Sequence, residues 1–155
     1  MQQLMEWLES TGIARAVGAS LSMTAWLSAF HAIGFTLVMS AGLVWNLHAS
    51  GILLARVSHV SIARPAERLL GLGLAVSLLT GFALFAPRAS YTAPSGVFQL
   101  KLSLILVAAI YQFAVIKSAT RRPVVSAFLL RASGALGTML WLSLGITACW
   151  FILFE

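Results

Sequence analysis

The sequence predicts an all-α integral membrane protein, a four-helix transmembrane bundle with an N-terminal interfacial amphipathic helix. The chain is 60% hydrophobic and only 9% charged, whereas about a quarter of the residues in a soluble domain are charged. Such a composition leaves too little polar surface to coat a water-soluble globule. The apolar residues also gather into four runs that, at about 1.5 Å per residue, can each cross a bilayer core of roughly 30 Å. We therefore expect a single transmembrane domain over residues 1–155.

Residues 2–19 are predicted to lie at the membrane surface rather than to cross it. Leu4, Trp7 and Leu8 fall on one helical face, and the two glutamates of this segment fall elsewhere. An apolar stripe with a tryptophan anchor is typical of a helix in the membrane interface. The segment has no basic region such as begins a signal peptide, and the first long apolar run starts only near residue 21. We therefore expect that run to be a retained span.

The first span is expected at about 22–47, and its one ionisable residue is His31. Ionisable groups inside a span are costly and usually face the bundle interior or water. His31 shares a helical stripe with Gly34 and Gly42, and small residues let another helix approach closely. The pattern therefore predicts that the imidazole points into the bundle.

The remaining spans are expected at about 65–86, 97–118 and 127–154. Pro65 suits the first turn of a helix, which places the start of the second span there. Small residues recur every four positions along this span, at Gly73, Ser77 and Gly81. Because they share one face, they predict a tight contact with a neighbouring helix.

The distribution of basic residues predicts the orientation in the membrane. Four spans place both termini on one side, together with Arg15, Arg88 and Lys101. Seven basic residues lie toward the other side, namely Arg56, Arg64, Arg68, Lys117, Arg121, Arg122 and Arg131. The positive-inside rule then puts both termini outside the cytoplasm of a bacterial inner membrane. Trp26 and Trp45, near the two ends of the first span, are expected at the outer and inner interfaces.

His31 is the strongest candidate for chemistry, and two interpretations remain open. In the first it is a neutral histidine that bonds a hydroxyl of a neighbouring span, with Ser77, Thr80 and Ser103 at suitable depths. In the second it ligates haem b, for which imidazole is a suitable axial ligand, or bonds a quinone. A partner histidine for haem is missing at that depth, because His48 lies about 25 Å further along the helix.

The other polar side chains give weaker signals. His48 and His59 are expected near the inner face, where they could pair or simply be solvated. Met23 and Met39 lie eight residues on either side of His31, about 12 Å away along the helix, too far for a compact copper site. Lys101 is expected either to reach the outer interface or to pair with an anionic group or a quinone-like carbonyl.

Several function classes are disfavoured by what the spans contain. They carry no Asp or Glu except at their edges, which argues against a transporter built on a carboxylate relay. We find no nucleophile motif, phosphate-binding loop or zinc signature, so we expect no enzyme, no metal site and no nucleic-acid partner. Cys149 is the only cysteine, so an intrachain disulfide is impossible.

Short motifs in a fixed order suggest a relationship. They are Trp7-Leu8-Glu9-Ser10-Thr11, His31-x-x-Gly34, Asn46-Leu47-x-x-x-Gly51, Arg68-Leu69-Leu70, Thr80-Gly81-x-x-Leu84-Phe85-Ala86, Tyr91 and Phe98-x-x-Lys101. In these the chain resembles a set of small four-span bacterial inner-membrane proteins classed as a domain of unknown function. The resemblance implies the fold and the inner membrane, and it implies no activity. It draws attention to four shared positions, His31, Arg68, Tyr91 and Lys101.

The chain also departs from the pattern of that family. Ser28 stands where a glutamate is usual one turn before the histidine, and Asn46 and His48 stand where Asp and Arg are usual. Ser28 and Asn46 carry no charge, so a charge pairing built on those family residues does not carry over to this chain.

Two functions from different classes follow. The first is a non-enzymatic structural or accessory subunit, embedded in the lipid bilayer and packed against itself or against other membrane subunits. The alternative is an electron-transfer membrane anchor that binds haem b or a quinone. Its candidate cofactor-binding residues are His31, Lys101, Tyr91 and Arg68. Transport of copper or of a small solute is less favoured than either.

Overall fold

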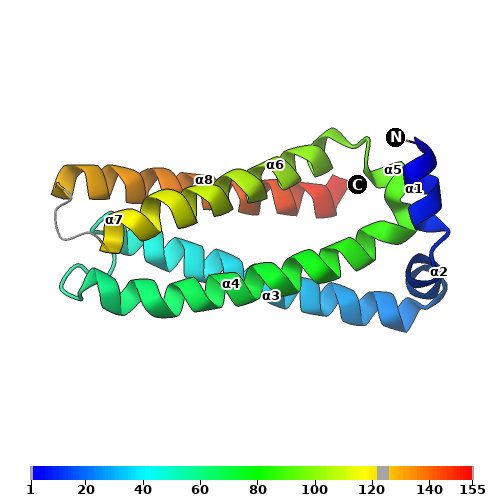
Figure 1. Ribbon diagram of the computed structural model, residues 1–155, viewed down its shortest axis with the longest axis horizontal. Coiled ribbons are helices and arrows are strands. Elements are labelled where there is room, and N and C mark those ends of the chain that lie inside the picture. The colour runs from blue at the N-terminus through cyan, green and yellow to red at the C-terminus, as the bar shows by residue number, and fades with distance from the viewer. Residues whose placement is uncertain (1, 122–125, 155) are drawn as a thin grey trace.

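The protein is an all-α four-helix bundle, as the composition predicts. A computed structural model describes residues 2–121 and 126–154, and these ranges contain no β-strand. Four rods run side by side: α3 (Leu21–Ala49), α4 (His59–Phe85), a third rod of α6 (Gly96–Tyr111), η2 (Gln112–Ile116) and α7 (Lys117–Arg121), and α8 (Ala127–Phe154) (Figure 1). Four helical regions are long and apolar enough to cross a membrane. The fold is that of a multi-pass membrane protein.

The rods form two layers. Figure 1 shows α3 beside α4 in one layer and the third rod beside α8 in the other, and α3 with α8 makes the main contact between the layers. Both ends of the chain lie at one end of the bundle, which we call the terminus end. The connection between α3 and α4 lies at the opposite end, the loop end.

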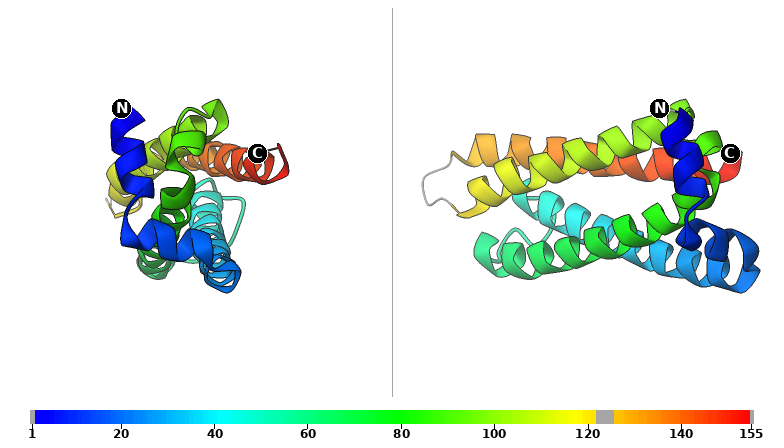
Figure 2. Two further views of the ribbon diagram at one scale, coloured as in Figure 1. Left: turned by 90° about the vertical axis from the view of Figure 1, so that its right-hand side faces the viewer. Right: turned by 45° about the vertical axis from the view of Figure 1, so that its right-hand side comes forward.

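The amino-terminal segment forms two short helices that lie across the terminus end. These are α1 (Gln2–Glu9) and α2 (Gly12–Ala19), and they contact the short helices η1 (Ala86–Arg88) and α5 (Ala89–Thr92) (Figure 2). The chain breaks between them because Thr11 caps α2, its hydroxyl accepting a hydrogen bond from the backbone N–H of Ala14.

The same segment is tied to the connection between α4 and α6. The Glu9 carboxylate accepts a hydrogen bond of 2.7 Å from the backbone N–H of Ser90. Ala14 and Val17 of α2 are buried, whereas Trp7 is 64% exposed. One face therefore packs on the bundle while the tryptophan stays on the surface, as expected of a peripheral helix.

Helix α4 begins at His59, six residues before the expected start at Pro65. Ser58 is the cap, since its hydroxyl accepts a hydrogen bond from the Ser61 N–H. Pro65 therefore lies inside the helix, where its missing N–H deprives the Ser61 carbonyl of a helical partner. A proline near the start of a helix is compatible with a cap placed further upstream.

The small residues predicted to face another helix do so within the chain. A methyl group added to Gly73 of α4 would lie 2.8 Å from the Gly34 carbonyl oxygen of α3. One added to Gly42 would lie 2.8 Å from the indole of Trp141 on α8. These contacts confirm the inward stripe of α3 and the tight face of α4.

Trp45 is fully buried between helices, so its prediction as an interfacial anchor is wrong. It lies on the inward stripe of α3 near the loop end, where the neighbouring helices cover it. Trp26, at the other end of α3, is 68% exposed and stays available to an interface.

A π-helical segment keeps one face of the third rod buried. Four residues at four-residue spacing are buried there, Ala108, Gln112, Ile116 and Thr120. In a straight α-helix of 3.6 residues per turn, each step of four residues rotates the face by about 40°. The wider turn of η2 at Gln112–Ile116 offsets this rotation. It thus holds Gln112 and Ile116 toward the core.

Candidate functional site

His31 lies between α3 and α4 and is bonded to α4. Its Nδ1 is 2.9 Å from the Ser77 carbonyl oxygen and 3.2 Å from the Thr80 hydroxyl. Because a carbonyl oxygen only accepts, Nδ1 carries the hydrogen. The ring rests on Gly81, where an added methyl group would lie 2.9 Å from His31 Cε1. The inward imidazole and the Thr80 partner are confirmed, whereas Ser77 contributes its backbone rather than its hydroxyl.

The four candidate positions lie on four different helices, His31 on α3, Arg68 on α4, Tyr91 on α5 and Lys101 on α6. Lys101 of α6 is half-buried, with Nζ 5.4 Å from the centroid of the Phe151 ring. Tyr91 is 72% exposed on α5 at the terminus end. Arg68 is exposed on α4, nearer the loop end. Tyr91 and Arg68 therefore share no site with His31.

His48 and His59 form the pair that their positions allowed. Their ring centroids are 4.6 Å apart at the loop end. His48 is buried, and its Nδ1 donates to the Leu53 carbonyl at 3.0 Å. His48 Nε2 and His59 Nδ1 are buried without a hydrogen-bond partner among the described residues. Two axial ligands of a haem lie on opposite sides of the ring, and 4.6 Å leaves no room for a macrocycle between them.

A buried amide network joins both layers and was not predicted from the sequence. Asn46 Nδ2 donates to the Gly42 carbonyl at 2.7 Å and to Gln112 Oε1 at 2.6 Å. The Trp141 indole donates to the same Gln112 oxygen at 3.0 Å. All three side chains are fully buried. The network thus connects α3, η2 and α8 inside the bundle.

Glycine makes room for this network. A methyl group at Gly137 of α8 would overlap the Asn46 side-chain oxygen. That oxygen and Gln112 Nε2 have no hydrogen-bond partner in the described part of the chain. The available sequence signal was the presence of two amides inside apolar spans, since polar side chains there usually find partners on other helices.

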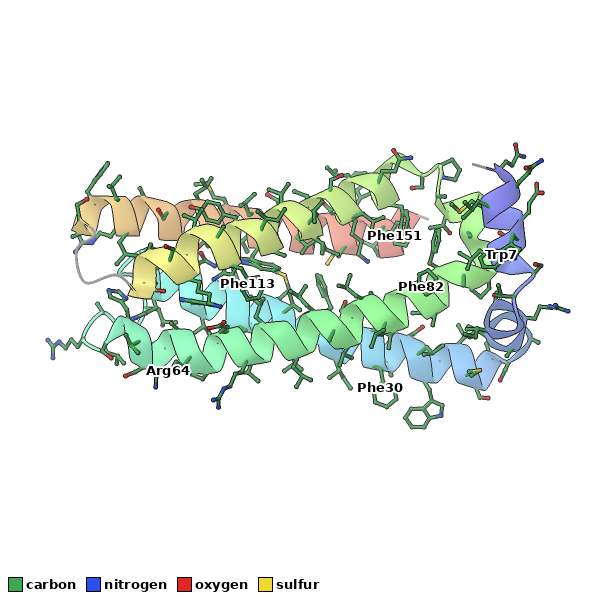
Figure 3. All side chains as sticks on the ribbon, viewed as in Figure 1. Trp7, Phe30, Arg64, Phe82, Phe113 and Phe151 are labelled. Carbon is green, nitrogen blue, oxygen red and sulfur yellow. The ribbon has the colours of Figure 1, made fainter. Side chains whose placement is uncertain are left out.

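A groove opens between α4 and the third rod toward the loop end. Its volume is about 660 Å³, and it is lined by Arg64, Glu67, Arg68, Gly71, Leu72 and Phe113. Across it, Glu67 of α4 and Lys117 of α7 form an ion pair of 2.5 Å. Figure 3 shows Arg64 on α4 and Phe113 on the facing rod. Arg68, one of the four candidate positions, belongs to this groove.

Neither the geometry nor the comparisons assign a cofactor. Among residues 2–121 and 126–154, no three His, Cys, Asp or Glu side chains are grouped so that they could hold a metal ion. The resemblance drawn from short motifs stays a prediction. The chain matches no protein-family model, no curated protein and no solved structure.

Proposed function

We propose that the protein is a non-enzymatic subunit of a bacterial inner membrane, which associates with copies of itself or with other membrane subunits. The observation that carries this proposal is the use of its buried polar groups. His31 bonds α3 to α4, and Asn46, Gln112 and Trp141 bond α3 to the opposite layer. Polar side chains that bond across helices hold a transmembrane bundle together. We infer that these polar side chains stabilise the bundle.

The surface available for association is apolar rather than glycine-lined. Neighbouring helices of the same chain already occupy the space beside four glycines, Gly34, Gly42, Gly73 and Gly137. Large apolar side chains remain exposed on the outer faces, including Leu79 of α4 at 73% and Ile146 of α8 at 68%. Lipid tails and the apolar faces of other subunits are the natural neighbours of such surfaces.

The charge distribution supports an orientation with both termini outside the cytoplasm. Basic residues of the described chain collect toward the loop end, namely Arg56, Arg64, Arg68, Lys117 and Arg131. The positive-inside rule assigns that end to the cytoplasm.

The proposal is tested by purifying the protein in a mild detergent. We expect a colourless preparation whose molecular mass, by light scattering, exceeds that of one chain or includes co-purifying subunits. His31→Gln should leave this assembly intact, because the amide can still bond the Ser77 carbonyl. A monomeric preparation without companions would contradict the proposal.

One observation favours a redox anchor as the second candidate. Because Nδ1 of His31 donates to the Ser77 carbonyl, the neutral ring keeps a lone pair on Nε2, the arrangement found in ligating histidines. A haem b bound there would need a second axial ligand other than His48 or His59. A Soret band that is lost in His31→Ala, or an extractable quinone lost in Lys101→Gln, would establish this role.

A further inference from the structure

We propose that the groove between α4 and the third rod binds an anionic phospholipid, with the headgroup at Arg64 and Arg68 and an acyl chain along Gly71, Leu72 and Phe113. The groove lies on the outside of four membrane-crossing rods, where lipids of one leaflet reach it. Basic pockets between transmembrane helices are typical headgroup sites for anionic lipids.

The charges of the groove select an anion. Arg64 and Arg68 lie one turn apart on α4, and both side chains are exposed. Neither makes an ion pair with any residue that the structure describes. Glu67, which lies between them in sequence, is neutralised by Lys117 at 2.5 Å. The groove therefore carries an excess of two positive charges, and guanidinium groups suit the bidentate binding of a phosphate.

The other half of the groove is shaped for an apolar chain. Gly71 supplies no side chain, and a methyl group added there would meet nothing within 4 Å. Leu72 and Phe113 form apolar walls beside this open space. Arg64 and Leu72 are eight residues apart, about 12 Å along the helix. A free phosphate would use only the basic half, whereas a phospholipid uses both.

Binding is measured by native mass spectrometry of the full chain in lipid-free detergent, titrated with phosphatidylglycerol or phosphatidylcholine. We expect phosphatidylglycerol to bind at least tenfold more tightly. The double variant Arg64→Gln, Arg68→Gln should lose about 30-fold in affinity for phosphatidylglycerol, because each basic residue near an anionic lipid contributes roughly a factor of five. Equal binding of the two lipids, or an unchanged affinity in the double variant, would overturn the proposal.

Matched variants separate lipid from other occupants. Arg56→Gln with Arg88→Gln removes the same charge elsewhere and should leave the affinity unchanged. Gly71→Leu places a side chain in the apolar half, at a position where an added Cβ meets nothing within 4 Å, and should weaken phosphatidylglycerol binding several-fold. Gly96→Leu, at a position equally open for an added Cβ, should not.

Two further outcomes would refute a lipid site. Inorganic phosphate at millimolar concentration should not displace the lipid. If it does, and if Gly71→Leu has no effect, the groove is a simple anion site. An acidic protein that co-purifies with the wild type and is lost in the arginine variant, while phosphatidylglycerol fails to bind, would equally exclude the lipid. Unchanged thermal unfolding of each variant by circular dichroism shows that the loss is local.

Discussion

The contact of α8 with the end of α3 makes a sharp prediction about Gly134. A methyl group at this position would lie 2.5 Å from the backbone nitrogen of Ser50 and 2.6 Å from the carbonyl oxygen of Asn46. Both are backbone atoms at the carboxyl end of α3, which cannot rotate away as a side chain can. Gly134→Ala must therefore push α8 away from α3, and we predict that it destabilises the bundle.

The size of the effect follows from three contributions. Overpacking a close contact costs about 1–3 kcal/mol, and contact with backbone atoms favours the upper part of that range. Displacing Asn46 also weakens its bond to Gln112, and an interhelical hydrogen bond in a membrane contributes about 0.6 kcal/mol on average. The higher helix propensity of alanine returns up to about 1 kcal/mol. The expected net loss in the free energy of unfolding is about 2 kcal/mol.

Gly71→Ala is the matched control, because its methyl group would enter open space. It should stabilise the protein by up to about 1 kcal/mol through helix propensity alone. Both variants can be unfolded by titrating sodium dodecyl sulfate into detergent micelles while the circular dichroism is followed. The two chemically identical changes should then differ by about 3 kcal/mol. Equal stability of the two variants would refute the close packing of α8 on α3.

Three further predictions address the polar contacts and the orientation. Thr80→Val removes one of the two partners of His31 and should cost about 0.6 kcal/mol in the same titration; a cost several times larger would show that the hydroxyl has another role. Trp141→Phe removes the second donor to Gln112 while keeping most of the ring volume, and should cost about 1 kcal/mol, so an unchanged stability would contradict the network. A reporter that is active only in the cytoplasm should be silent when fused to the carboxyl terminus, and an active fusion would reverse the orientation.

The fold was predictable because the extent of each helix, and the face that it buries, can be read from a single stretch of sequence. Long apolar runs indicate the extent, and small residues at four-residue spacing indicate the buried face. The apolar run that was expected at 127–154 corresponds to the helix Ala127–Phe154. The inward face of His31 followed from the glycines that share its stripe, and its ring does rest on Gly81 of the neighbouring helix. A histidine inside a span needs a partner, and Thr80 was among the few hydroxyls at the same depth.

The amide network could not be predicted by the same reasoning. Whether Gln112 points inward depends on the π-helical segment, which shifts the face of the third rod. Whether Asn46 can reach it depends on the absence of a side chain at Gly137, on a different helix. The burial of Trp45 likewise depends on how closely the neighbouring helices approach. These features arise from helix–helix packing, and a single helix considered alone does not contain them.

Helix α3 occupies a special place in the bundle because its two polar contacts face different layers. His31 bonds α4, its partner within the layer, whereas Asn46 bonds Gln112 in the opposite layer. The two residues are 15 positions apart, about 22 Å along the helix. Loss of the Asn46 contact should therefore loosen the layers at the loop end while α3 and α4 stay together. Since the proposed lipid groove lies between the layers at that same end, we expect loss of the Asn46 contact to change the shape of the groove although Asn46 does not line it.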